Sequence, residues 1–122
     1  MVTLLVTLAA GAGALCRYLV DAGVQRGRWR PLPAGTFAVN ISGSFVLGLL
    51  VGLTMHHGLD TSASTVLGAG FLGGYTTLST WAWESLALAE QDAKAAAVVN
   101  VVGSLVLGMA AGAAGLGLAL LG

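Results

Sequence analysis

The sequence predicts an all-α integral membrane protein with four transmembrane helices per subunit, the third of them broken. The 122 residues are 57% hydrophobic and 8% charged, and the mean hydropathy is +0.90, well outside the range of soluble domains. Four apolar segments are long enough to cross about 30 Å of hydrocarbon, which takes roughly 20 helical residues. In the third, the pair Gly73-Gly74 and a run of hydroxyl side chains interrupt the apolar pattern.

Short polar connections join the four predicted spans, which cover about residues 2–20, 34–55, 65–89 and 95–121. No basic residue precedes the first apolar run, which fits a first span better than a signal peptide. We therefore expect one four-helix membrane domain over residues 1–122 and no second module.

The first span carries one charge, Arg17, near its end. A charge at a helix centre costs roughly 2.5 to 3.5 kcal/mol, and less towards an end. Two interpretations stay open: the side chain extends to the membrane surface, or it supports a polar entrance that concentrates anions. Cys16 is the only cysteine, so one chain has neither a disulfide framework nor a cysteine metal cluster.

The second span has a polar stripe. Thr36, Asn40 and Ser44 are spaced by four residues and therefore share one helix face. The amide of Asn40 offers two N–H donors and cannot titrate, which suits an anion that must bind and then leave. The alternative is a hydrogen bond between helices, a common use of asparagine and serine in membranes that is worth about 1 kcal/mol.

The third span contains the break and most of the hydroxyl groups. Lipid cannot satisfy backbone groups freed by a break at Gly73-Gly74, so such backbone lines a cavity, binds an ion or is buried in protein. Because the positive edge of an aromatic ring can face a small anion, Trp81 is a candidate for an ion path. Trp83 is expected to contact lipid, and Glu84 to support a polar network or carry protons. The hydroxyl residues after the break are Thr76, Thr77, Ser79 and Thr80.

The fourth span repeats the four-residue spacing with Asn100 and Ser104. Two polar stripes and the hydroxyls together exceed what helix contacts need and favour a polar conduit. Four helices make a bundle too thin to enclose a pathway alone, so we expect an oligomer. Glycines four apart predict close helix contacts at Gly48/Gly52, Gly70/Gly74 and Gly108/Gly112.

The basic residues of the connections all lie on one side. Because loops alternate sides, the first and third loops share a compartment, and they hold Arg26, Arg28, Arg30 and Lys94. The termini and the second loop hold no lysine or arginine. The positive-inside rule therefore places these two loops in the cytoplasm and both termini outside.

Several classes of function receive no support from the sequence. No nucleophile with a base, phosphate loop or metal motif is present, so we do not expect an enzyme. Zero formal net charge gives no support to a nucleic-acid partner. His56 and His57 are expected to be solvated loop residues rather than metal ligands.

Together these motifs resemble those of the Fluc (CrcB) family of small fluoride channels. The resemblance covers essentially the whole chain in number of spans, loop length and order. The motifs that carry it lie in residues 11–18, which include Arg17, residues 35–45, which include Thr36 and Asn40, and residues 70–84, which end at Glu84.

The resemblance implies an antiparallel, dual-topology dimer in the cell inner membrane, with two pores and a structural sodium ion at its interface. Main-chain carbonyls of Gly73 and Thr76 from each subunit would hold the sodium. The implied function is passive export of cytoplasmic fluoride. The implied anion path comprises Thr36, Asn40, Leu78, Ser79, Thr80, Trp81, Asn100 and Ser104, with Arg17 and Glu84 in support.

Two features depart from the family pattern. Leu78 and Trp81 stand where the family has phenylalanine, and the loop charges are one-sided although a chain that pairs with itself inverted needs balanced loops. A single hypothesis explains both: the chain is one half of an antiparallel heterodimer with a homologous chain of opposite charge bias. A homodimer stays open as an equal alternative.

Two other functions also stay open. A small four-helix, proton-coupled drug or cation exporter is also an antiparallel dimer, but it needs a carboxylate near the membrane midplane. Asp21 and Glu84 both lie towards the ends of their spans. The other alternative is an assembly subunit that transports nothing and is rich in glycine only for packing.

Overall fold

Helices account for nearly all of the chain that can be described, which confirms the predicted all-α class. The computed structural model describes residues 1–25 and 32–121, and no strand occurs among them. The elements in chain order are α1 (Val2–Gln25), α2 (Ala34–His56), α3 (Thr61–Thr65), the π-helical η1 (Val66–Leu72), α4 (Gly73–Tyr75), α5 (Leu78–Glu90) and α6 (Lys94–Ala119).

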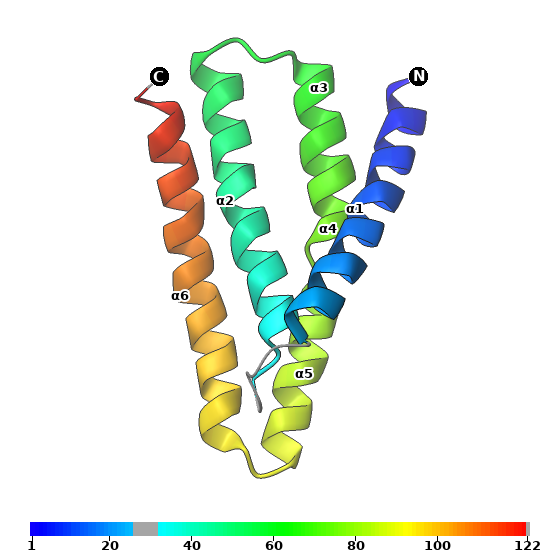
Figure 1. The fold of residues 1–122 in the computed structure, drawn as a ribbon. Coiled ribbons are helices and arrows are strands. Elements are labelled where there is room, and N and C mark those ends of the chain that lie inside the picture. The colour runs from blue at the N-terminus through cyan, green and yellow to red at the C-terminus, as the bar shows by residue number, and fades with distance from the viewer. Residues whose placement is uncertain (26–31, 122) are drawn as a thin grey trace.

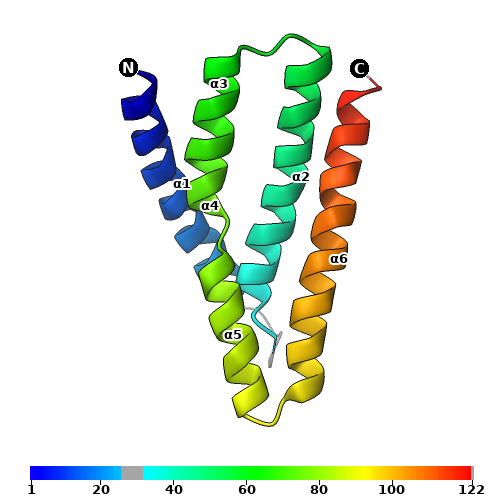
Figure 2. The same ribbon diagram turned by 180° about the vertical axis from the view of Figure 1, so that it is seen from behind.

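The elements run up and down as a thin bundle (Figures 1 and 2). The elements α3, η1, α4 and α5 follow one another and run antiparallel to α2 and α6 (Figure 1). Helix α1 packs against η1, α4 and α2, while α2 packs along α6. Both chain ends lie on the side that carries the α2–α3 connection, and the α5–α6 connection lies on the opposite side (Figure 1).

Three helical stretches of the described chain are long and apolar enough to cross a membrane: Val2–Val24, Ala34–His56 and Lys94–Ala119. Only 6% of the most apolar window of α1, and the same share in α6, is buried. Large apolar side chains such as Leu8, Leu19 and Val98 are exposed there. Such surfaces fit hydrocarbon or a protein partner and not water, so the fold is that of a multi-pass membrane protein.

The segment between α2 and α6 changes conformation at two threonines. Thr76 (φ −79°, ψ 161°) and Thr77 (φ −147°, ψ 124°) are extended, and α5 starts directly after them. The prediction that Gly73-Gly74 itself interrupts the helix is wrong, because both glycines are helical and Gly73 has φ −61° and ψ −35°. The extended residues follow the pair.

The glycines before the break are needed for packing instead. A Cβ atom on Gly74 would overlap the carbonyl oxygen of Ala10, and one on Gly13 would overlap the carbonyl oxygen of Phe71. Helix α1 therefore lies directly on the backbone of η1 and α4, an approach that only glycine permits.

Glycines also bring α2 and α6 together. A Cβ on Gly48 would overlap the carbonyl oxygen of Gly112, and one on Gly52 would overlap the Cβ of Ala119, as the four-residue spacing predicts. Gly115, which that pattern does not include, lies against the carbonyl oxygen of Phe45. At Gly108, by contrast, a Cβ would stand 3.6 Å from Ser44 Oγ, an ordinary contact, so this position does not require glycine.

Residues in and near the connections form a few polar contacts. Asp60 caps α3 by accepting a hydrogen bond from the Ala63 N–H at 3.0 Å. His57, expected only to be solvated, is exposed but also lies 2.6 Å from the carbonyl oxygen of Ala119 through its Nε2 atom. Lys94 forms a highly exposed ion pair with Asp92 that contributes little. The predicted cytoplasmic charges Arg26, Arg28 and Arg30 lie outside the described residues.

Candidate functional site

Asn40 supplies the hydrogen bonds that the backbone of Thr77 would otherwise lack. Its Nδ2 donates to the Thr77 carbonyl oxygen at 2.8 Å, and its Oδ1 accepts from the Thr77 N–H at 2.9 Å. Both polar groups of an extended peptide inside the bundle are thereby satisfied, as burial away from water requires. The interhelical role considered for Asn40 is therefore present, and one of its two amide N–H groups is committed to it.

Arg17 reaches the neighbouring residue of the break. Its Nη1 donates to the Thr76 carbonyl oxygen at 3.2 Å, and the side chain is half-buried. The N–H and the hydroxyl of Thr76 both donate to the Leu72 carbonyl oxygen, at 2.9 Å each. A guanidinium bound at the break favours a supporting role at a polar entrance over simple extension to the membrane surface.

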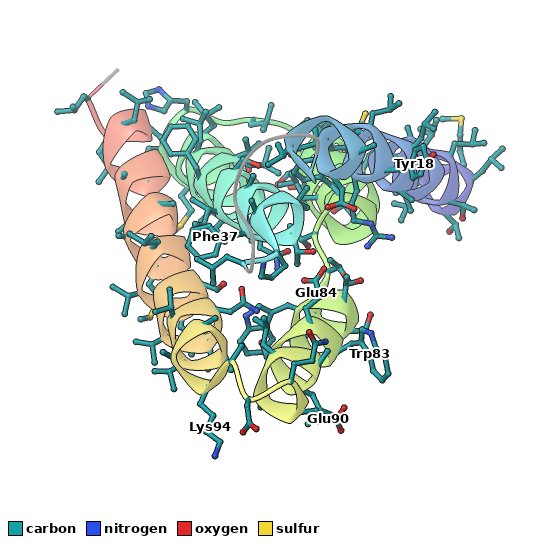
Figure 3. All side chains as sticks on the ribbon, turned by 60° about the horizontal axis from the view of Figure 1, so that its bottom comes forward. Tyr18, Phe37, Trp83, Glu84, Glu90 and Lys94 are labelled. Carbon is teal, nitrogen blue, oxygen red and sulfur yellow. The ribbon has the colours of Figure 1, made fainter. Side chains whose placement is uncertain are left out.

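The start of α5 is capped by Thr77, whose Oγ1 accepts from the Thr80 N–H at 3.2 Å. Further along α5, Glu84 accepts a hydrogen bond from the buried hydroxyl of Thr36 at 2.9 Å. Figure 3 shows Glu84 between α5 and α2, whereas Trp83 points away from the bundle. Trp83 is 69% exposed, in keeping with the expected lipid contact.

Three adjoining spaces surround the break. A groove of about 330 Å³, open on one side and here called the break groove, is lined by Asn40, Gly43, Ser44, Gly73, Thr76, Thr77 and Leu78 among others. A second space of about 160 Å³, which is open like the first and is here called the inner cavity, is lined by Asn40, Leu78, Trp81, Ser104 and Leu105. An arginine cavity of about 210 Å³ is lined by Ala14, Arg17, Tyr18, Asp21, Thr36, Val39, Thr77 and Thr80.

These spaces share walls. Asn40 and Leu78 border both the break groove and the inner cavity, and Thr77 borders both the break groove and the arginine cavity. The arrangement is a sequence of small spaces with uncharged polar groups on their walls, and two ionisable side chains, Arg17 and Asp21, line the arginine cavity at the side.

Most, but not all, predicted path residues line these spaces. Ser79 lines none of the three; it is exposed, and its hydroxyl lies 3.5 Å from that of Thr77. Asn100 is fully buried, and it too lines none of them. Those that do line the spaces are Thr36, Asn40, Leu78, Thr80, Trp81 and Ser104.

Some polar residues near the break were not foreseen. Ser85 takes part in hydrogen bonds between α5 and α6, and its spacing of four residues from Trp81 is the one signal that the sequence offered. Asp21 borders the arginine cavity, where its Oδ1 is buried without a partner in the described part of the chain. The hydroxyl of Tyr75 lies 2.9 Å from that of Ser42, a contact that no spacing rule indicates.

The chemistry of the break suits a hard cation. Gly73 and Thr76 both line the break groove. The Thr76 carbonyl oxygen accepts a hydrogen bond from the Arg17 guanidinium, so a metal cation at this oxygen would have to share it with that positive charge. Carbonyl oxygens are the ligands that such ions prefer, although two carbonyls are fewer than a full set. The described residues contain no cluster of three or more His, Cys, Asp or Glu that offers another metal site. Gly73 and Thr76 thus have the ligand chemistry of a partial cation site.

Comparison with known proteins identifies the family. The family described as "CrcB-like protein, Camphor Resistance (CrcB)" matches residues 4–116. The chain is 48% identical over 120 residues to "Fluoride-specific ion channel FluC 1" of Leifsonia xyli subsp. xyli, covering 97% of this chain and 85% of the relative. It is 48% identical over 118 residues to FluC 1 of Symbiobacterium thermophilum, covering 95% and 94%. It is 44% identical over 106 residues to FluC 2 of Mycolicibacterium paratuberculosis, covering 87% and 84%. The chain therefore belongs to the CrcB-like family.

Proposed function

We propose that this chain is a subunit of a fluoride-selective channel through which cytoplasmic fluoride leaves the cell down its gradient. The observation that carries the proposal is the set of uncharged polar groups around the break, on the walls of three adjoining spaces. The relatives are named fluoride-specific ion channels, which supports the same function here. Passive conduction involves no catalysed reaction.

The inner cavity offers donors that suit a small, strongly hydrated anion. The Ser104 hydroxyl has no partner within the described residues, and Asn40 has one amide N–H beyond that given to Thr77. Neutral donors replace water around an ion without holding it as strongly as a fixed charge does, so the ion can leave again. Arg17, at the side of the path, raises the local concentration of anions.

We further propose that an inverted second chain closes the path. The third crossing would then consist of α3 to α5 with its extended link facing the partner across the open break groove. Carbonyls of Gly73 and Thr76 from both chains would hold a sodium ion, which supplies a fixed positive charge at the interface. The partner would thus complete both the wall of the path and the cation site.

The partner is either an identical chain or a homologue. The one-sided loop charges favour a single orientation, with the termini outside the cell membrane, and so favour a different, inverted chain as partner. Leu78, which is 76% exposed at the groove, has no ring edge to offer an anion. In a heterodimer the path that depends on Leu78 would be impaired, while the other conducts.

Fluoride flux from liposomes tests the proposal. Vesicles that contain the chain, alone or with an inverted homologue, are expected to release fluoride and retain chloride, as measured with ion-selective electrodes. Asn40→Asp places a negative charge on the path and is expected to abolish the flux. Thr7→Val is the matched control, because the Thr7 hydroxyl bonds only within α1, to the Thr3 carbonyl. Normal flux in Asn40→Asp would contradict the assignment of the path.

The same vesicles distinguish a channel from a proton-coupled exporter. A channel is expected to conduct fluoride without a proton gradient. In Glu84→Gln the rate of fluoride flux is free to change, but flux without a proton gradient is still expected. Transport of an organic cation that requires a proton gradient and disappears in Glu84→Gln would favour the exporter instead.

A further inference from the structure

A closed set of three hydrogen bonds, two of them between α5 and α6 and one within α5, lies next to the inner cavity. The Trp81 Nε1–H donates to the carbonyl oxygen of Asn100 at 3.2 Å. The Asn100 Nδ2 donates to Ser85 Oγ at 2.9 Å, and the Ser85 hydroxyl donates to the Trp81 carbonyl oxygen at 2.7 Å. The set returns to the residue at which it began, and we call Trp81, Ser85 and Asn100 the tryptophan bracket.

The bracket determines which way the Asn100 amide faces. Ser85 has one hydroxyl hydrogen and gives it to the Trp81 carbonyl, so towards Asn100 it acts as an acceptor. The nitrogen of the Asn100 amide must therefore face Ser85. Its oxygen faces elsewhere, buried and without a partner in the described part of the chain.

Asn100 is consequently unsuited to meet an anion. The side chain is 0% exposed and lines none of the three spaces around the break. Its unpartnered oxygen is an acceptor, which repels a halide, and the one amide N–H that remains beyond the bond to Ser85 is enclosed with the rest of the side chain. Its contact with the indole of Trp81 is made by the main chain: the Asn100 carbonyl oxygen accepts the hydrogen bond of the indole N–H.

The same bonds decide what Trp81 presents to the inner cavity. The indole N–H is given to Asn100, so the cavity is bordered by the ring and not by a free N–H donor. The ring is one of five side chains around a space of about 160 Å³. Rotation of a group as large as indole would change the width of that space substantially.

We infer that Ser85 and Asn100 are positioning residues that act through the main chain: the bond between their side chains holds α6 against α5, so that the Asn100 carbonyl stays within reach of the Trp81 N–H and the ring stays a fixed wall of the inner cavity. This inference rests on the proposed function in one respect, namely that the fixed wall sets the width of the anion path and thereby its discrimination between fluoride and chloride.

Tryptophan spectroscopy tests the bracket without reference to transport. In a Trp29→Phe, Trp83→Phe background, Trp81 is the only tryptophan. Ser85→Ala removes the hydrogen bond between the Ser85 and Asn100 side chains, which links α5 to α6, and is expected to raise the population of other ring orientations about fivefold, the change that loss of one neutral hydrogen bond produces. Time-resolved fluorescence anisotropy measures this population, and ultraviolet resonance Raman reports the hydrogen bond of the indole N–H.

Two variants serve as controls. Ser85→Thr keeps a hydroxyl that can bond the carbonyl four residues back, and is expected to restore both signals. Ser79→Ala, on the exposed side of α5, is expected to change neither. Unchanged anisotropy and Raman signals in both Ser85→Ala and Asn100→Ala would overturn the bracket.

Flux in vesicles then tests the consequence for selectivity. Ser85→Ala is expected to lower the ratio of fluoride to chloride flux by about the same fivefold factor, and Ser85→Thr to restore it. A mobile ring with an unchanged ratio would overturn the role in selectivity. If vesicles that contain the wild-type chain release no fluoride, with or without a partner chain, the proposed function is wrong. The tryptophan bracket is then tested by the two spectroscopic measurements alone.

Discussion

Asn40 replaces the helical hydrogen-bond partners of Thr77, one of the two extended residues between α4 and α5. A helix carries its own hydrogen bonds, but the extended Thr77 has lost them, and one amide side chain from α2 satisfies both its N–H and its carbonyl. An amide is the side chain that can donate and accept at once without a charge. Since the same residue borders two of the spaces, it links the stability of the break to the shape of the path.

Asn40→Ala is expected to destabilise the fold as well as stop conduction. The change leaves the N–H and the carbonyl of Thr77 without their partners, and each such group costs about 1 to 3 kcal/mol. Thermal unfolding in detergent is expected to show a lower melting temperature than in Ser42→Ala, a neighbouring variant that loses only bonds to the Val39 carbonyl and the Tyr75 hydroxyl. Equal melting temperatures would show that Asn40 does not support the break.

At the scale of elements, the glycines of η1 and α4 determine how close α1 lies. Gly70 and Gly74 face α1, and Gly13 of α1 faces them in turn, so each helix leaves room for the backbone of the other. Arg17 is carried on the same helix, and its bond to Thr76 depends on this approach. The packing of α1 thus places a cation at the break.

Gly74→Ala is expected to push α1 outward and cost about 1 to 3 kcal/mol, the usual penalty for overpacking a tight contact. Gly11→Ala is the matched control on α1, because a Cβ there has no neighbour within 4 Å. It is expected to be neutral or slightly stabilising, since alanine is the better helix former. The melting temperatures of the two variants in detergent measure the difference. Equal values would contradict the close approach of α1 to the backbone of α4.

The sequence predicted some of these features for physical reasons and missed others. Hydropathy and length define long apolar helices, and the spacing of four predicted that Gly48 and Gly52 face α6, because both signals are local to one helix. The position of the break was missed by a few residues, since the glycine pair stays helical where α1 packs on it. The hydrogen bond of Asn100 was also not foreseen, because its partner Ser85 belongs to another helix.

At the scale of the whole molecule, the chain looks like half of an assembly. The break groove is open, and the outer faces of α1 and α6 are covered with exposed apolar side chains. Lipid suits the apolar faces, and the backbone groups of Thr76 and Thr77 are bonded within the chain by Arg17 and Asn40. The proposed second subunit would cover the open groove, and the proposal depends on the orientation of each chain in the membrane.

Labelling of single cysteines measures that orientation. In a Cys16→Ala background, Asp60→Cys lies on the α2–α3 connection and Asp92→Cys on the α5–α6 connection, at opposite ends of the bundle (Figure 1). With a membrane-impermeant maleimide on whole cells, Asp60→Cys is expected to label and Asp92→Cys to stay unlabelled. Equal labelling of both would indicate insertion in two orientations and favour an identical partner.

The two extended threonines also have an electrostatic consequence. The helix that ends at Tyr75 directs the negative end of its dipole towards the link, and α5, which starts at Leu78, directs its positive end towards the same link. Opposite partial charges therefore lie a few residues apart, and neither depends on a proton. The link therefore presents partial charges of both signs that do not change with pH.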